Sequence, residues 1–318
     1  MVLPNILESI NGDNESGHTR KLEFSEGSIP TLSFEFFPPK TDQGMANLMK
    51  RMDSMSDMKP EWIDVTFGAG GSTKNRTLEI CEMAVKDFGM NVMMHLTCTN
   101  MSRNDIDSVL GKMKSIGIRN VLALRGDPPT GTTEWITSDS GFSHAVDLVR
   151  YIRSKFDDYF CIAVAGYPEG HADSDSFESD LHFLKEKVDA GADVVVTQLF
   201  YDTEAYFEFV QRLRHLGVRV PVIPGVMPIS SLPSLKRMSS MCRVHVPDAI
   251  LNDLEAIKED EEAVREYGVN LAAQMCKDLL KHQVAGVHIY TMNNEDNIRE
   301  IVKQIAPLLP SRYSEWLT

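Results

Sequence analysis

The chain has 318 residues, of which 42% are hydrophobic and 25% are charged, a composition typical of a globular protein with a sizeable core. Its net charge of -14 argues against nucleic acids and anionic membranes as partners, because the molecule as a whole repels polyanions. No apolar run approaches the roughly 20 residues that cross a membrane, and the N-terminus lacks the basic and apolar regions of a secretory signal.

The five cysteines point to a reducing compartment. Their number is odd, they are far apart, and no C-x-x-C motif occurs. Disulfide frameworks and zinc sites usually show closer and paired spacings. We therefore expect reduced, mostly buried thiols in a cytoplasmic protein.

Residues 1–29 are polar and show no sustained period, so we expect a flexible N-terminal tail. After them, short β-branched or aromatic runs alternate with longer amphipathic stretches. The predicted strands are 31–37, 61–67, 91–97, 119–125, 159–167, 193–200, 220–226 and 285–291. The predicted helices are 42–57, 73–88, 102–116, 141–155, 176–190, 202–216, 229–240, 247–257, 261–282 and 294–306. Eight strand-then-helix units predict an α/β fold, a (β/α)8 TIM barrel over 30–310 with a C-terminal tail at 311–318.

Polar or aromatic residues recur at the predicted strand ends, about 30 residues apart, which is the length of one strand-and-helix unit. They are Glu35, Thr66, His95, Arg125, Tyr167, Gln198 and Tyr290. In a barrel the carboxyl ends of the strands converge on one rim, where barrel enzymes have their active sites. We therefore expect these side chains to surround one site.

The segment SFEFFPPK (33–40) places Ser33, Glu35 and Phe37 on one strand face and Phe34 and Phe36 on the other. Apolar surroundings would raise the pKa of the Glu35 carboxyl, which suits a general acid near neutral pH. A salt-bridged carboxylate at the barrel mouth fits the same pattern equally well.

Two further segments have simple structural alternatives. TFGAGGST (66–73) is neither a dinucleotide fingerprint nor a P-loop, so a plain loop is favoured, although its flat backbone would let a ligand approach. Asp64, His95 and His288 are the best candidates for a metal site, yet none are spaced as ligands on one helix, so we expect no metal.

Cationic side chains follow the fourth and fifth predicted strands. Arg125 in ALRGDPP is suited to bidentate contact with a pyrophosphate, and Asp127 could tune a neighbouring ring. Asp180 and Lys187 lie seven residues apart, two turns along one helix face, so Lys187 could help hold a phosphate. Structural ion pairs are the alternative for both segments.

Eight segments, in order, resemble the catalytic domain of methylenetetrahydrofolate reductases of the eukaryotic branch. They are SFEFFPPKT, IDVTFGAGGST, MHLTCTN, NVLALRGDPP, VAGYPEGH, LKEKVDAGADVVVTQLFYD, PVIPGVMPI and HIYTMN, and they span about 31–295. The resemblance implies a homo-oligomeric enzyme that uses NADH or NADPH and non-covalent FAD to reduce 5,10-methylenetetrahydrofolate. It leaves the choice between the two nicotinamide cofactors open.

The resemblance also assigns roles to individual residues. Glu35 matches the general acid, and Asp127 matches an acidic residue beside the flavin ring and the folate. The FAD-binding positions are Thr66, Phe67, Ala69, His95, Arg125, Gly126, Asp127, His144, Ala145, Tyr167, His171, Asp180 and Lys187. Gln198 and Tyr290 match substrate contacts.

The chain departs from the family pattern at two positions. Family members often have Tyr in place of His144. They also often have Arg in place of Asn294, and that Arg is suited to contact a carboxylate or phosphate of the ligand. Eukaryotic members usually also carry a C-terminal domain that binds S-adenosylmethionine, and we expect this chain to be insensitive to that effector. The rival functions are another FAD-dependent barrel of the proline dehydrogenase type, for which AGVHIYTMNN lacks a basic pair, and a non-catalytic flavin-binding subunit.

Overall fold

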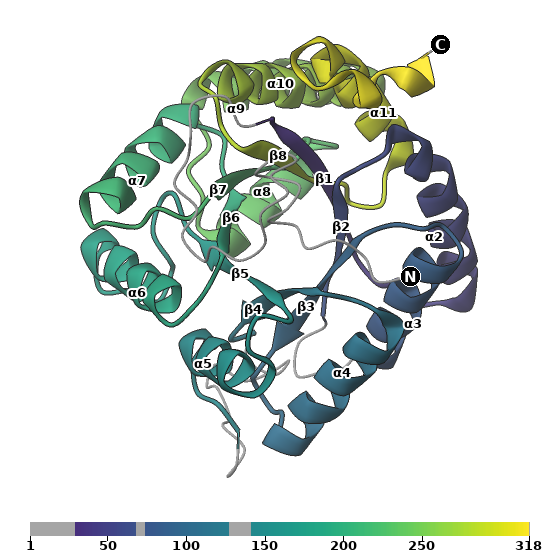
Figure 1. Cartoon of the computed structure of the whole chain (residues 1–318). Helices are drawn as coiled ribbons and strands as arrows, with labels where there is room; N and C mark the ends of the chain where they lie inside the picture. The colour runs from purple at the N-terminus through teal and green to yellow at the C-terminus, as the bar shows by residue number, and fades with distance from the viewer. Residues whose placement is uncertain (1–28, 68–73, 127–140, 318) are drawn as a thin grey trace.

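Eight parallel strands form a closed barrel in chain order, in a computed structural model that describes residues 29–67, 74–126 and 141–317. The strands are β1 (Thr31–Phe36), β2 (Trp62–Val65), β3 (Val92–Thr97), β4 (Asn120–Leu124), β5 (Cys161–Gly166), β6 (Val194–Leu199), β7 (Val222–Val226) and β8 (Gly286–Tyr290). The barrel closes because β1 pairs with both β2 and β8. Figure 1 looks into the ring of strands, with helices around it. The predicted (β/α)8 barrel is therefore confirmed.

The helices follow the strands as the sequence predicts. They are α2 (Asp42–Met55), α3 (Lys74–Lys86), α4 (Arg103–Ile116), α5 (Ala145–Phe156), α6 (Phe177–Asp189), α7 (Thr203–His215), α8 (Leu232–Cys242), α9 (Asp248–Ile257), α10 (Glu261–Lys281) and α11 (Glu295–Ile305). Helix α8 begins three residues later than predicted, because Ser231 caps it and Pro233 fits its first turn. Helix α5 begins at Ala145 rather than at 141, with His144 as its N-cap.

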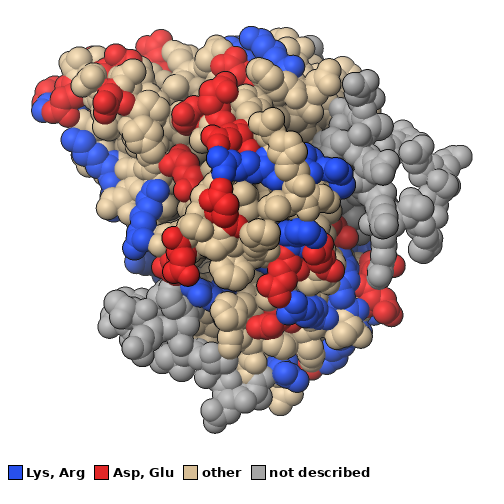
Figure 2. Space-filling view, turned by 90° about the vertical axis from the view of Figure 1, so that its left-hand side faces the viewer, with Lys and Arg blue, Asp and Glu red and all other residues tan. Residues whose placement is uncertain are grey.

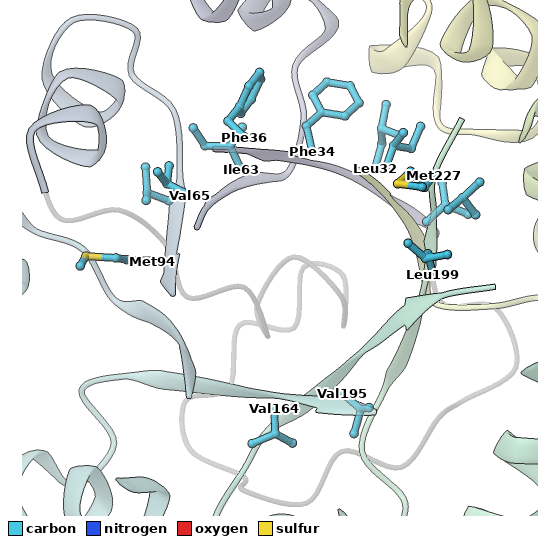
Figure 3. Close-up of a cluster of buried hydrophobic side chains, with 14 of the residues drawn as sticks. Leu32, Phe34, Phe36, Ile63, Val65, Met94, Val164, Val195, Leu199 and Met227 are labelled. Atoms are coloured by element: carbon cyan, nitrogen blue, oxygen red, sulfur yellow. The ribbon is translucent and has the colours of Figure 1, made fainter. Parts of the chain in front are cut away.

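Alternation along β1 separates the packing face from the site face. Leu32, Phe34 and Phe36 are fully buried and point outward from the barrel, where they pack in the main hydrophobic core (Figure 3). Ser33 and Glu35 lie on the other strand face, as predicted. A second apolar cluster, of residues on the opposite strand face, comprises Trp62, Met93, Leu122, Cys161, Ala163, Val194, Val196, Ile223 and Ala285. This packing supports the strands from both faces.

Residues 311–317 lie in the predicted C-terminal tail. They form two short 3-10 turns that pack on the barrel, η4 (Ser311–Tyr313) and η5 (Glu315–Leu317). Tyr313 is fully buried, and its hydroxyl accepts a hydrogen bond from the backbone N–H of Leu32 at 3.3 Å. Trp316 Nε1 donates to the carbonyl of Tyr313. The aromatic side chains explain this docking, because they bury a large apolar area.

Across residues 29–67, 74–126 and 141–317, no helix combines the length and the apolarity that a bilayer span requires. Acidic and basic side chains are interspersed on the face shown in Figure 2. On α7, for example, Arg212 pairs with both Glu178 and Glu208. None of the five cysteines forms a disulfide, and four of them are buried, as predicted.

Candidate active site

The carboxyl ends of the strands bring the predicted site residues to one rim. Four of these residues lie in strands near that end, namely Glu35 in β1, His95 in β3, Gln198 in β6 and Tyr290 in β8. Thr66, Arg125 and Tyr167 directly follow β2, β4 and β5. Parallel pairing places Glu35 beside Asp64 on one side and beside Tyr290 on the other. The rim is therefore polar, while the strand faces behind it are apolar.

Three side chains from adjacent strands meet within this rim. His95 Nε2 lies 3.2 Å from Asp64 Oδ2, with which it forms a hydrogen bond, and 3.6 Å from Glu35 Oε2. The Asp64 side chain is fully buried, the His95 side chain is 8% exposed, and the Glu35 side chain is 20% exposed. Glu35 is thus the member of the cluster that a ligand at the mouth can touch.

Burial and neighbouring charges raise the pKa of Glu35 and of His95, and the raised pKa of Glu35 favours a proton donor. Burial raises the pKa of Glu35 to about 7, with the charge of His95 opposing the shift and the charge of Asp64 adding to it. Burial lowers the pKa of His95, but the hydrogen bond to Asp64 and the charges of Glu35 and Asp64 outweigh it, so the net shift is upward. A carboxyl that titrates near neutral pH matches the requirement for a general acid.

The same three residues are types that also bind metal ions. One ligand atom from each lies within 4.8 Å of the others. From the sequence, the best candidates for a metal site were Asp64, His95 and His288. The sequence therefore did not predict that Glu35 lies beside Asp64 and His95. We interpret the cluster as a proton-handling group, because His95 Nε2, the ring nitrogen that faces both carboxyl groups, already bonds Asp64. Asp64 was detectable in the sequence as a charge within the apolar strand EWIDVTF.

Cationic side chains line the rim beyond β4 and β5. Arg125 forms an ion pair of 2.9 Å with Asp173, from the loop that follows β5. Lys187 on α6 donates to the carbonyl of Ala165, and burial lowers its pKa to about 8 against the opposing charge of Asp180. These cations are therefore held in fixed positions rather than extended into solvent.

The remaining candidates from this part of the rim lie close to the same strand ends. The rings of Tyr167 and His171 meet edge to face, with centroids 4.6 Å apart. Burial raises the pKa of Asp180 and lowers that of His171. His144 caps the N-terminus of α5, where Ala145 is the first helical residue.

Gly126 and Phe67 show how the backbone shapes the rim. Gly126 has a φ of 90°, and a Cβ atom there would lie 2.8 Å from Cβ of Thr97. Only glycine allows this conformation and this close approach. Phe67 is buried beside Thr66, whose carbonyl accepts from Thr77 Oγ1. Ala69 and Asp127 lie outside the described residues.

On the opposite side of the mouth, Tyr290 spans from β8 to β6. Its hydroxyl donates to the carbonyl of Thr197 at 2.5 Å, and a Cβ atom at Gly225 would lie 2.6 Å from Cε2 of Tyr290. Gly225 therefore makes room for the Tyr290 ring, a role that the sequence analysis missed, although Gly within a strand marks such close approaches. Gln198 Oε1 accepts from the backbone N–H of Leu199.

The family model "Methylenetetrahydrofolate reductase" matches residues 21–306. Methylenetetrahydrofolate reductase (NADH) 1 of Arabidopsis thaliana is 43% identical over 98% of this chain. 5,10-methylenetetrahydrofolate reductase of Salmonella typhimurium is 35% identical over 85% of this chain and 88% of its own length. The chain belongs to the methylenetetrahydrofolate reductase family.

The residues that match the methylenetetrahydrofolate reductase family include all eight strands of the barrel. The chain spans about half the length of the curated plant and yeast relatives that it matches, for example 52% of the Arabidopsis thaliana protein. Among solved structures, a Clostridium thermocellum protein described as binding two copies of 5-methyl-5,6,7,8-tetrahydrofolic acid covers 90% of this chain, with a TM-score of 0.59 and 13% identity. At that identity the likeness shows the fold alone.

Of the two departures from the reductase pattern, Asn294 has a structural role through its side chain and His144 takes part through its backbone. Asn294 is the N-cap of α11, and its side chain accepts a hydrogen bond from the backbone N–H of Asn297. The backbone N–H of His144 donates to the carboxylate of Asp147 at the start of α5. Both positions thus stabilise helix ends that face the rim.

Proposed function

We propose that this chain reduces 5,10-methylenetetrahydrofolate to 5-methyltetrahydrofolate, with FAD as its resident cofactor and NADH or NADPH as the electron donor. The Glu35 carboxyl at the barrel mouth carries the proposal, because its pKa is raised to about 7 in a chain of the reductase family. Bound FAD would supply hydride transfer, taking a hydride from the nicotinamide and passing it to the one-carbon unit.

Glu35 would perform the proton transfer that the folate requires. The five-membered ring of the substrate opens when its departing nitrogen receives a proton, and Glu35 would donate that proton. Opening leaves a cationic iminium on the folate. We propose that the carboxylate of Asp127 stabilises this cation by Coulomb attraction.

The residues at the rim fit FAD. Arg125 and Lys187 place two cations beyond β4 and β5, which suits a pyrophosphate. Gly126 lacks the Cβ atom that would clash with Thr97, so the backbone after β4 can run close to β3 where a large ligand would approach. Thr66, Phe67, Ala69, His95, His144, Ala145, Tyr167, His171 and Asp180 are the further residues that we propose to hold it.

Tyr290 and Gln198 would bind and position the folate. Tyr290 is held rigidly by its hydrogen bond to Thr197, so its ring offers a fixed apolar surface. The Gln198 carbonyl oxygen is engaged by Leu199, and we propose that its amide NH2 group donates to the substrate. Cysteines without disulfides, four of them buried, agree with the proposed cytoplasmic location.

The function is tested by measuring the two half-reactions separately. Purified yellow protein is reduced anaerobically with NADH or with NADPH, and the reduced protein is then mixed with 5,10-methylenetetrahydrofolate in a stopped-flow instrument. We expect reduction by at least one nicotinamide cofactor, followed by reoxidation by the folate and formation of 5-methyltetrahydrofolate. Protein that binds no flavin, or reduced protein that the folate does not reoxidise, would contradict the proposal.

A further inference from the structure

Asp64 is a buried carboxylate with a single described partner. It lies on β2, opposite Glu35 of β1 and Met93 of β3, and its side chain is fully buried. Its Oδ2 accepts from His95, while Oδ1 has no hydrogen-bond partner among the residues that the structure describes. A buried carboxylate is costly unless it is paired. Compensation of the Asp64 charge therefore depends on His95.

The bond to Asp64 favours a protonated His95 side chain. A hydrogen bond and a negative charge at 3.2 Å favour the protonated imidazole, and the pKa of His95 is raised despite its burial. The same Nε2 faces Glu35 Oε2 at 3.6 Å. A protonated His95 thus places a positive charge beside the oxygen that becomes negative when Glu35 gives up its proton.

We propose that Asp64 is a positioning residue that keeps His95 protonated, so that the imidazolium stabilises the Glu35 carboxylate formed by proton transfer to the substrate. This inference rests on the role of Glu35 proposed above. In this arrangement Glu35 of β1 contacts the substrate and His95 of β3 supplies the positive charge. Asp64 of β2 keeps that charge in place.

The other titratable groups that face the cluster do not supply this charge. From β8, the pKa of His288 is lowered by burial, with its Nδ1 bonded to Ser33 Oγ, and the pKa of Tyr290 is raised well above its usual value by burial, so both are neutral near pH 7. Tyr167 of the β5 end is a further phenol. Arg125 is paired with Asp173. Among the described side chains, Asp64 and His95 are therefore the pair that acts on Glu35.

The first test reads the protonation states directly and needs no turnover. NMR titration of the purified holoprotein, labelled with 15N-histidine and carboxyl-13C-glutamate, follows His95 and Glu35, and the signals are assigned with His95→Gln and Glu35→Gln. We expect His95 of the wild-type protein to titrate above the usual value of 6.5. In Asp64→Asn its pKa should fall, and that of Glu35 should rise by about one unit. The rise is the net effect, because the His95 charge lowers the Glu35 pKa by more than the Asp64 charge raises it. A wild-type His95 that titrates below 6.5 would overturn the proposal even if the variant does not fold.

The second test uses the folate half-reaction of the reduced holoenzyme. In Asp64→Asn the pH at which this half-reaction is half lost should move upward, and the rate below that pH should fall by up to about tenfold, since one pKa unit is a tenfold change in an equilibrium constant. Ser33→Ala is the control, because Ser33 bonds His288 and not the cluster. A lower rate with an unmoved pH midpoint, or the same shift in Ser33→Ala, would show a merely structural role. A wild-type protein that fails to reduce the folate but shows the expected NMR titration would contradict the proposed function and leave the Asp64–His95 coupling standing.

Discussion

The hydroxyl of Tyr313 accepts a hydrogen bond from the backbone N–H of Leu32, which joins the last described turns of the chain to the first strand of the barrel. Both residues are fully buried. Strand β1 also carries Glu35, so the docked C-terminal segment supports the strand on which the candidate proton donor lies.

Replacing Tyr313 should therefore destabilise the barrel. Tyr313→Ala removes a fully buried aromatic ring, which typically costs about 3–5 kcal/mol. Tyr313→Phe removes only the hydroxyl and its hydrogen bonds with Leu32, Arg312 and Glu61, at about 1–3 kcal/mol. Urea unfolding followed by circular dichroism measures both. Leu308→Ala, at a side chain that is 39% exposed, is the control and should change little. Equal stability of Tyr313→Ala and the wild type would show that the segment does not contribute to the folded barrel.

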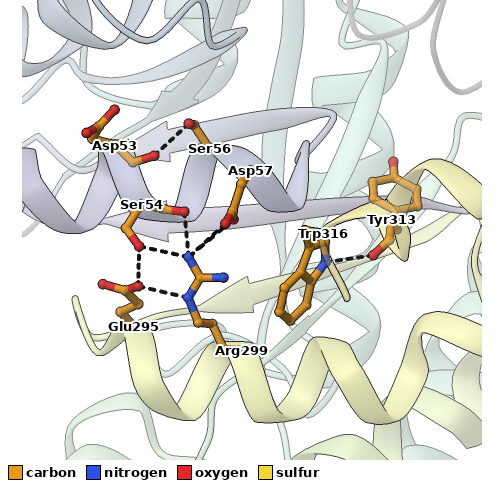
Figure 4. A network of polar contacts seen from close by, with 8 residues as sticks. All are labelled: Asp53, Ser54, Ser56, Asp57, Glu295, Arg299, Tyr313 and Trp316. Atoms are coloured by element: carbon orange, nitrogen blue, oxygen red, sulfur yellow. Dashed lines mark hydrogen bonds and ion pairs between the residues drawn. The ribbon is translucent and has the colours of Figure 1, made fainter. Parts of the chain in front are cut away.

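A polar network joins α11 to the end of α2 (Figure 4). Arg299 donates to the carbonyl and hydroxyl of Ser54, to Glu295 at 2.8 Å and to Asp57 at 3.2 Å. Its guanidinium also lies over the Trp316 ring, 5.2 Å from the centroid. With 22% of its side chain exposed, it is well shielded from water.

We expect Arg299→Ala to lower the free energy of unfolding by about 1–3 kcal/mol, because several charge-assisted bonds are lost together. Arg212→Ala is a matched control on α7, where the arginine pairs with Glu178 and Glu208 and is 41% exposed. Exposed pairs contribute about 0–1 kcal/mol. Urea midpoints of the two variants give the comparison, and similar losses would mean that the α2–α11 network is no stronger than a surface pair.

Glu35→Gln should separate the two half-reactions. The variant keeps a polar side chain of the same size but cannot donate the proton, so we expect flavin reduction by NADH or NADPH to persist and folate reduction to be lost. In the wild-type protein, folate reduction should decline as the pH rises through about 7, since the donor must be protonated. Stopped-flow traces of both steps provide the measurement. Comparable losses in both would assign Glu35 a structural role instead.

The raised pKa of Glu35 also predicts a pH dependence of stability. The pKa of about 7 in the folded state exceeds the usual value of 4.5, so the folded state binds more protons between these limits. The stability contributed by this group is present below 4.5 and is lost as the pH rises through about 7. Urea midpoints of Glu35→Gln should therefore decline less over this range than those of the wild type. Parallel curves would mean that the carboxyl titrates alike in both states.

Replacing Lys187 should weaken FAD binding, whereas replacing its neighbour Lys185 should not. Lys187→Met removes a buried cation beside the rim and should weaken FAD binding about 10- to 100-fold, the value of a hydrogen bond to a charged group. Lys185→Met, on the same helix, removes an outer pair with Asp189 and should have little effect. Wild-type affinity should fall as the pH rises above about 8, where Lys187 loses its proton. Flavin fluorescence measures each affinity, and equal effects of the two substitutions would place the phosphates elsewhere.

Local sequence patterns determined the architecture and most strand ends. Alternation along TLSFEF separates Glu35 from Phe34 and Phe36, and the repeat of about 30 residues places one polar side chain on each of several strands. Both signals depend on neighbours along the chain, so they are readable without coordinates. The start of α8 was missed by three residues because the cap at Ser231, rather than the apolar period, decides where the helix begins.

Contacts between distant segments were decided only by the tertiary structure. His95 and Asp64 lie 31 residues apart, and Arg125 and Asp173 lie 48 apart, and no local pattern indicates that these side chains face each other. Strand stagger and side-chain rotamers set such pairings, and both depend on how the whole core packs. Tyr313 shows the same limit, because its sequence neighbourhood is that of a polar chain end, and only the barrel supplies the apolar site that buries it.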